Sequence, residues 1–173
     1  PEAIRREIEA IRTLCLEGGA SDALVATDAE KRKQMWDVRR AISLRIEEAY
    51  PLDIQEDIVV PIGRIAEFVE CLPEFEAAYG GKIYAFGHSG DGNIHLSVTA
   101  GSLDARPQAE EVVRKIIERV VSMGGTMSGE HGVGIAKQPF LPIELSAESM
   151  RLQREIKLLF DPNLILNPGK LFA

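Results

Sequence analysis

The sequence predicts an α+β domain with a ferredoxin-like antiparallel sheet, helices packed on one face of the sheet, and a helical carboxy-terminal tail. Three observations support this prediction. Segments with helical periodicity alternate with short apolar segments. Two short segments, 82–86 and 93–99, flank a glycine-rich stretch of hairpin length. The helix predicted at 103–123 is apolar along one broad face, as a helix covering a sheet must be.

The first half of the chain is predicted to contain three helices and two strands. The first helix ends at glycines 18–19, and its apolar stripe is Ile4, Ile8, Ile11 and Cys15. Residues 23–27 form a short buried strand, and Thr27 with Glu30 then caps a helix that runs to about Glu48. Residues 49–57 are expected to be a mobile loop and 57–61 a strand. Pro61 begins the next helix, with the stripe Ile62, Ile65, Val69 and Leu72.

The second half begins with the hairpin and continues into the long helix at 103–123. The apolar face of that helix consists of Val112, Val113, Ile116, Ile117, Val120 and Val121. A glycine-rich loop at 124–134 and a last helix at 147–160 follow. Four strands with helices on one face are the economical arrangement. A small parallel α/β fold is weaker, because no glycine-rich turn follows the first strand.

Composition limits the classes of protein to which the chain can belong. A length of 173 residues suits one domain, with a sheet-and-helix region at about 1–145 and a closing helix and tail at about 146–173. The net charge of −7 argues against nucleic acid. No apolar run approaches the roughly 20 residues of a membrane span. Cys15 and Cys71 lie far apart and outside any CxxC motif, which indicates reduced, mostly buried thiols in a cytoplasmic protein.

The stretch "GHSGDGNIH" (87–95) carries two of the three histidines of the chain. Folding it about Gly90-Asp91 places His88 opposite Asn93, and Phe86 opposite His95. Opposed residues share one side of a sheet, so His88, Asn93 and His95 should converge on one face. The other interpretation is a solvated polar face, in which the histidines have no special role.

Two neutral imidazoles on adjacent strands suit a borderline-soft divalent metal such as zinc. A third ligand could come from "SGEHGVG", where Glu130 offers a carboxylate oxygen. His131, next in sequence, would point elsewhere and remain free as an acid or base. Two histidines and a glutamate with open coordination positions are typical of a catalytic metal site.

Three motifs, "GHSGDGNIHLSV", "GGTMSGEHGVGIAKQPFL" and "DPNLILNPGKLF", resemble the carboxy-terminal domain of the FAD-linked oxidases. This family of vanillyl-alcohol-oxidase-like flavoenzymes includes the glycolate oxidase flavin subunit, D-lactate dehydrogenases and D-2-hydroxyglutarate dehydrogenases. The resemblance implies that FAD is bound mainly by an amino-terminal domain absent from this chain. The chain is then the cap, or substrate, domain with its closing tail, and is inactive alone.

The resemblance also implies a division of roles around the substrate. His88, His95 and Glu130 would hold a divalent metal, most commonly zinc, against a small D-2-hydroxy acid of the glycolate or D-lactate class. His131 would take the hydroxyl proton while hydride passes to FAD and the 2-oxo acid forms. Asn93 would hydrogen-bond the substrate.

Three further residues receive roles through the resemblance. "MWDVRRAIS" places Arg39 on the substrate carboxylate, with Ser43 one helical turn later. Asn167 of "NPGK" resembles the family residue that lies against the flavin. Some relatives carry a lysine where this chain has Gln55 or Glu56, which disfavours dicarboxylate substrates. The alternatives are a solvated Arg39 and an Asn167 that only closes a Pro-Gly turn.

Two other functions remain open at this level. One is a self-contained metallohydrolase built on the same two-His–Glu site, and the other is a non-catalytic oligomerisation module. The flavoenzyme interpretation predicts three macromolecular partners: its own FAD domain, an electron-acceptor subunit and a second copy in a homodimer. It predicts no transmembrane segment, and a cytoplasmic location with peripheral attachment to the inner membrane as an alternative.

Overall fold

The computed structural model describes residues 2–171, which divide into two compact units on either side of the Arg45–Ile46 junction. The first unit contains α1 (Glu2–Glu17) and most of α2 (Ala29–Ala49). The second contains the end of α2 and everything after it, including a three-stranded sheet. The sequence-predicted α+β class is therefore confirmed.

The structure corrects four sequence predictions: three lie in the first unit, and the fourth, that of mostly buried cysteines, also concerns Cys71 in the second. Residues 23–27 join no β-ladder within the described chain, because a short apolar run becomes a strand only where another strand accepts its backbone hydrogen bonds. Asp28, not Thr27, caps α2, since its Oδ1 accepts the N–H of Lys31 at 2.8 Å. Cys15 is exposed and Cys71 is partly buried, and both are free thiols. The predicted stripe of α1 contains no buried residue.

The sheet of the second unit is antiparallel in the order β1-β3-β2, from β1 (Leu52–Val59), β2 (Lys82–His88) and β3 (Asn93–Ala100). It has three strands among the described residues, not the expected four. The loop predicted at 49–57 is also wrong, because β1 already begins at Leu52. Its charged residues resemble those of a loop, yet Glu56 lies within ion-pair distance of Lys137 on one face of the strand, and Asp57 accepts loop N–H groups on the other.

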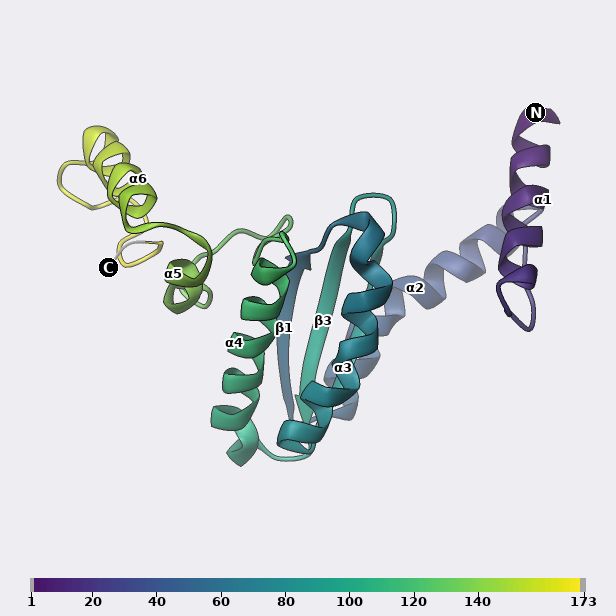
Figure 1. The fold of residues 1–173 in the computed structure, drawn as a ribbon, viewed down its shortest axis with the longest axis horizontal. Helices are drawn as coiled ribbons and strands as arrows, with labels where there is room; N and C mark the ends of the chain where they lie inside the picture. Colours follow the sequence, from purple (N-terminus) through teal and green to yellow (C-terminus); the bar gives the residue numbers. More distant parts are fainter. Residues whose placement is uncertain (1, 172–173) are drawn as a thin grey trace. The chain divides into compact units, whose positions relative to one another are not determined.

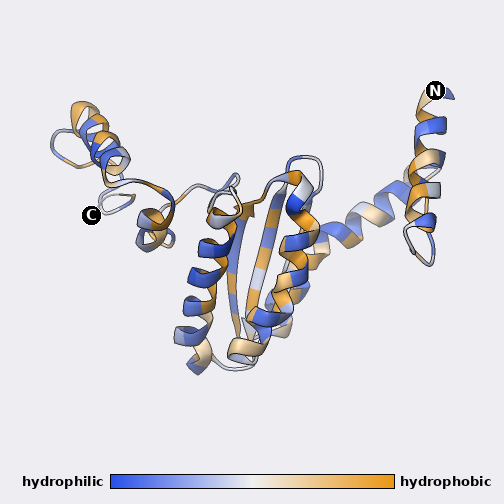
Figure 2. Ribbon diagram, viewed as in Figure 1, coloured by the Kyte–Doolittle hydropathy of each residue, from blue (hydrophilic) through white to orange (hydrophobic). Residues whose placement is uncertain are grey.

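Helices α3 (Ile65–Tyr79) and α4 (Arg106–Ser122) cover one face of this sheet (Figure 1). Figure 2 shows the polar residues of α4 on the side away from the sheet. The predicted apolar face of α4 is confirmed: five of its six residues are buried, and Val121 packs partly buried against them. A short 3₁₀ turn, η2 (Leu103–Ala105), precedes the helix.

The predicted stripe of α3 is partly wrong. Ile62 and Val69 are exposed, while Phe68 and Leu72 enter the core. Pro61 is followed by a 3₁₀ turn, η1 (Ile62–Arg64), before the α-helix begins. A 3₁₀ turn has three residues per turn, so it shifts the phase of the apolar stripe relative to a continuous α-helix.

The carboxy-terminal segment contains η3 (Gln138–Phe140), α5 (Leu141–Glu144) and α6 (Ala147–Phe160), the last with the predicted bounds. Asp161 is buried after α6 and accepts the N–H groups of Ile165 and Leu166. The N–H of Leu171 then donates to Gly134 O, which joins the tail to the glycine-rich loop. Within residues 2–171, every helix is too short or too polar to span a bilayer.

Candidate metal centre

The hairpin between β2 and β3 has the predicted register. His88 pairs with Asn93, and Phe86 pairs with His95. The turn spans residues 89–92, and Gly92 adopts a φ of 79°, which a residue with a side chain adopts only with strain. Because β3 also pairs with β1, Asp57 lies directly opposite His95 on its other side.

The structure brings His88, His95 and Glu130 together. One potential ligand atom from each lies within 4.8 Å of those of the other two. The His88 and His95 ring centroids are 5.7 Å apart, and His95 Nε2 is 3.7 Å from Glu130 Oε1. The predicted convergence of these three side chains is therefore confirmed. His88 and Glu130 are exposed, so the cluster is open on one side.

His131 belongs to the same cluster instead of pointing elsewhere. Its ring stacks on that of His95, with centroids 5.6 Å apart and planes at 23°. Together with Asp57 and His95 it makes a second, overlapping set of potential metal ligands. The loop curls around one carboxylate, so the side chains of two successive residues both come close to His95.

His95 has the electrostatic state that a metal ligand requires. Burial lowers its pKa below the ordinary value, and the nearby carboxylates of Asp57 and Glu130 oppose this effect only in part. A lowered pKa keeps the imidazole neutral near pH 7, and only a neutral imidazole offers a lone pair to a metal.

Asp57 holds the loop that carries Glu130 and His131, a role that its sequence context did not indicate. Its Oδ2 accepts the backbone N–H groups of Gly129, Glu130 and His131 at 2.9, 2.7 and 2.9 Å. Burial alone would raise the pKa of Asp57, but the hydrogen bonds from His131 and Glu130 outweigh burial and hold it below the ordinary value. A Cβ atom on Gly129 would lie 2.8 Å from Asp57 Oδ1, so this approach requires glycine.

Lys137 supports the same loop from the core face of the sheet. Its buried ammonium donates to Asp57 O at 2.6 Å and to Met127 O at 2.7 Å. It also lies 3.3 Å from Glu56 Oε2, close enough for an ion pair, although this oxygen accepts no hydrogen bond from the described residues. Burial raises the pKa of Glu56, and the charge of Lys137 opposes this.

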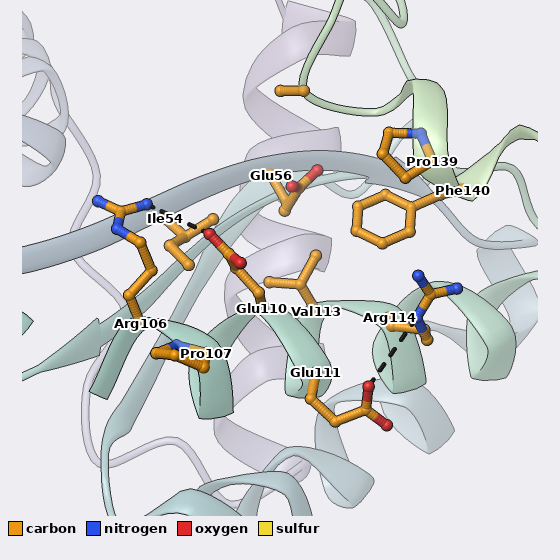
Figure 3. Close-up of a pocket in the computed structure, with 11 residues that line it drawn as sticks. Ile54, Glu56, Arg106, Pro107, Glu110, Glu111, Val113, Arg114, Pro139 and Phe140 are labelled. Carbon is orange, nitrogen blue, oxygen red and sulfur yellow. Dashed lines mark ion pairs between the residues drawn. The ribbon is translucent and has the colours of Figure 1, made fainter. Parts of the chain in front are cut away.

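Glu56 also lines a cavity of about 520 Å³ between β1, α4 and residues 136–140 (Figure 3). Two arginines at the cavity are paired with glutamates of α4, Arg106 with Glu110 at 3.5 Å and Arg114 with Glu111 at 3.9 Å. No histidine lines this cavity, so it is separate from the cluster.

We expect Lys137→Met to lower the free energy of unfolding by about 3–5 kcal/mol, because it leaves the Glu56 carboxylate buried without its cation. Urea denaturation followed by circular dichroism measures this change. The matched control is Lys82→Met, which removes an exposed pair with Glu76 and should cost about 0–1 kcal/mol. Equal losses in the two variants would show that the buried ammonium does not support the loop.

The remaining predicted site residues lie on different elements. Asn93 is buried, and its carboxamide oxygen accepts no hydrogen bond from the described residues. Arg39 and Ser43 lie one turn apart on α2, in the first unit, while the cluster belongs to the second. Asn167 is exposed in a turn with a φ of 48°, and its carbonyl accepts the N–H of Lys170.

Comparisons with known proteins agree on one family. A family model described as "FAD linked oxidases, C-terminal domain" matches residues 1–171. The glycolate oxidase subunit GlcD of Bacillus subtilis (strain 168) is 36% identical over 99% of this chain and 37% of its own length. A D-lactate dehydrogenase of Anaerostipes hadrus is 36% identical over 98% of this chain and 36% of its own. A D-2-hydroxyglutarate dehydrogenase of Xanthomonas citri pv. viticola is 31% identical over 94% of this chain and 35% of its own length. The chain thus spans little more than a third of these relatives.

Proposed function

Since the chain belongs to the FAD linked oxidases, C-terminal domain family, we propose that it is the substrate-side part of a flavin-dependent dehydrogenase. This enzyme would oxidise a small D-2-hydroxy acid to the 2-oxo acid. The observation that carries the proposal is the convergence of His88, His95 and Glu130 beside His131. All of the relatives named above are oxidases or dehydrogenases, which favours this function over a metallohydrolase or an oligomerisation module.

The donor atoms of the cluster fit a divalent metal, most commonly zinc. Two imidazoles and a carboxylate are a frequent ligand set for catalytic zinc, and they leave coordination positions open for substrate. When bound, the metal supplies a Lewis acid that polarises the hydroxyl and carboxylate oxygens of the substrate. His88, His95 and Glu130 suit this role better than the overlapping set, because Asp57 is fully buried and already accepts three N–H groups.

The other side chains would bind and orient the substrate and move one proton. His131 would accept the hydroxyl proton at a ring nitrogen, and Asn93 would hydrogen-bond the substrate. Arg39, whose planar guanidinium pairs bidentately with carboxylates, would bind the acid group with Ser43 beside it. FAD would supply the hydride acceptor. Asn167 in the tail would lie against the flavin ring.

The residues around β1 favour a substrate with a single carboxylate. Gln55 is uncharged, and Glu56 faces the core with Lys137 as its partner. This part of the strand therefore offers no cation for a second carboxylate. Glycolate or D-lactate fits this better than 2-hydroxyglutarate.

A further part of the enzyme would bind FAD and cover the apolar surface of the tail. Leu159, Phe160 and Ile165 are between 71% and 79% exposed. Exposed apolar surface of this kind marks an interface. In this proposal residues 146–173 are the closing helix and flavin-facing tail, and 1–145 the cap region. We also predict a homodimer and an electron-acceptor subunit. The predicted location is the cytoplasm, with peripheral attachment to the inner membrane as the alternative.

Anaerobic mixing of the flavin-loaded, full-length protein with candidate acids tests the proposal. D-lactate or glycolate should bleach the flavin absorbance, and D-2-hydroxyglutarate should be slower. A strong chelator should abolish the reduction, and added zinc should restore it. Absence of bleaching by all three acids contradicts the proposed substrate class. Reduction that persists after complete metal removal contradicts the metal site.

A further inference from the structure

Asp57 lies next to His95 of β3 and next to the loop that carries Glu130 and His131. It lies on β1 opposite His95, its side chain is fully buried, and its two oxygens have different surroundings. We propose that Asp57 is the positioning residue of this site: one carboxylate oxygen holds the loop of Glu130 and His131, and the other sets the tautomer of His95. This inference rests on the proposed function only where it concerns metal affinity.

The first role follows from Oδ2. Three successive backbone N–H groups, those of Gly129, Glu130 and His131, point at this single oxygen over 2.7–2.9 Å. Converging N–H groups of this kind form an anion-binding concavity, and here the anion belongs to the chain itself. The backbone from which Glu130 and His131 project is therefore fixed relative to β1.

The second role follows from Oδ1. This oxygen is buried, accepts no hydrogen bond from residues 2–171, and lies 3.7 Å from His95 Nδ1. A buried acceptor without a partner costs free energy, so a proton on Nδ1 is favoured, where a small ring movement brings it to the usual ~2.9 Å. Nε2, the ring nitrogen 3.7 Å from Glu130 Oε1, then keeps its lone pair for a metal.

Substituting asparagine for Asp57 would separate the two roles. The three N–H groups need an acceptor, so the amide oxygen must take the place of Oδ2, and the NH₂ group must face His95. That NH₂ group donates to Nδ1 and moves the ring proton to Nε2. The loop then keeps its hydrogen bonds, while His95 presents a proton where it should present a lone pair.

The test uses the full-length protein as wild type, Asp57→Asn and Asp53→Asn. Asp53 is the matched control, because it lies on the same face of β1 and bonds to Gln55 instead of the loop. Long-range ¹H–¹⁵N spectra of the metal-free proteins at about pH 8, above the ordinary histidine range, report the tautomer of each ring. Competition with a chromophoric chelator then measures zinc affinity.

The expected result is a proton on Nδ1 of His95 in the wild type and Asp53→Asn, and on Nε2 in Asp57→Asn. Zinc affinity should fall roughly 10–100-fold in Asp57→Asn alone. An unchanged tautomer or unchanged zinc affinity in Asp57→Asn overturns the inference. If that variant does not fold, the wild-type spectrum decides, since a proton on Nε2 there overturns the inference by itself. A wild type that has the expected tautomer but binds no zinc instead overturns the proposed metal site.

Discussion

Replacing His131 by alanine should leave metal content near the wild-type value and slow flavin reduction by roughly 10²–10⁴-fold, the usual contribution of a positioned general base. His131 is exposed and its ring stacks on that of His95, so a substrate on a metal held by His88, His95 and Glu130 would have its hydroxyl near His131. No other imidazole would then be free to take the proton, because the remaining two histidines of the chain are the proposed metal ligands. Stopped-flow reduction of the full-length enzyme measures the rate, and elemental analysis measures the metal.

His131→Gln provides a second test of the same role. Glutamine keeps much of the side-chain volume and can hydrogen-bond, but it does not accept a proton near neutral pH. It should therefore be nearly as slow as alanine, with similar substrate affinity. Reduction at the wild-type rate in either variant shows that His131 is not the base.

Replacing Glu130 by alanine should remove metal and substrate affinity together. It deletes the only anionic ligand of the proposed set and leaves two imidazoles, so the loss of zinc affinity should exceed the roughly 10–100-fold that second-shell changes cause. Zinc retained after dialysis, and the substrate concentration that half-saturates flavin reduction, are the two measurements. The rate at saturating substrate and added zinc should recover in part, because His131 is still present.

The control for Glu130 is Glu118→Ala, which removes an exposed glutamate from α4 and should change neither measurement.

Comparing the metal content of His131→Ala with that of Glu130→Ala also shows which of the two overlapping ligand sets holds the ion. If Glu130→Ala keeps its metal while His131→Ala loses it, the ion is held by Asp57, His95 and His131, and the proposed assignment is wrong.

The β2–β3 hairpin and helix α4 were predictable from sequence because the residue patterns that define them span only a few neighbouring positions. The turn between β2 and β3 is four residues long, so its length and the two-residue period of a strand determine which side chains share a face. His88, Asn93 and His95 were placed correctly on this basis. The broad apolar face of α4 was predicted for the same reason, since a helical period needs no distant partner.

Errors arose where a distant partner decides the local structure. Residues 53–57 resemble a loop because three of the five are acidic, yet they form a strand whose charges meet Lys137 and the loop N–H groups. Residues 23–27 resemble a strand, yet within the described chain they have no strand to pair with. In each case propensity and pattern were overridden by the presence or absence of partners elsewhere in the chain.

The sequence alone determined the family, the hairpin and the identity of the four side chains around the candidate metal centre. Only the tertiary structure decided that Asp57 lies beneath them and that His131 stacks on His95. The three hydrogen bonds that hold the loop join residues 72, 73 and 74 positions apart. Contacts at that separation depend on how β1 pairs with β3 and on where the loop after α4 returns to the sheet. Both depend on the packing of the whole core. The local spacing and periodicity of residues do not indicate such contacts, so the sequence pattern could not predict them.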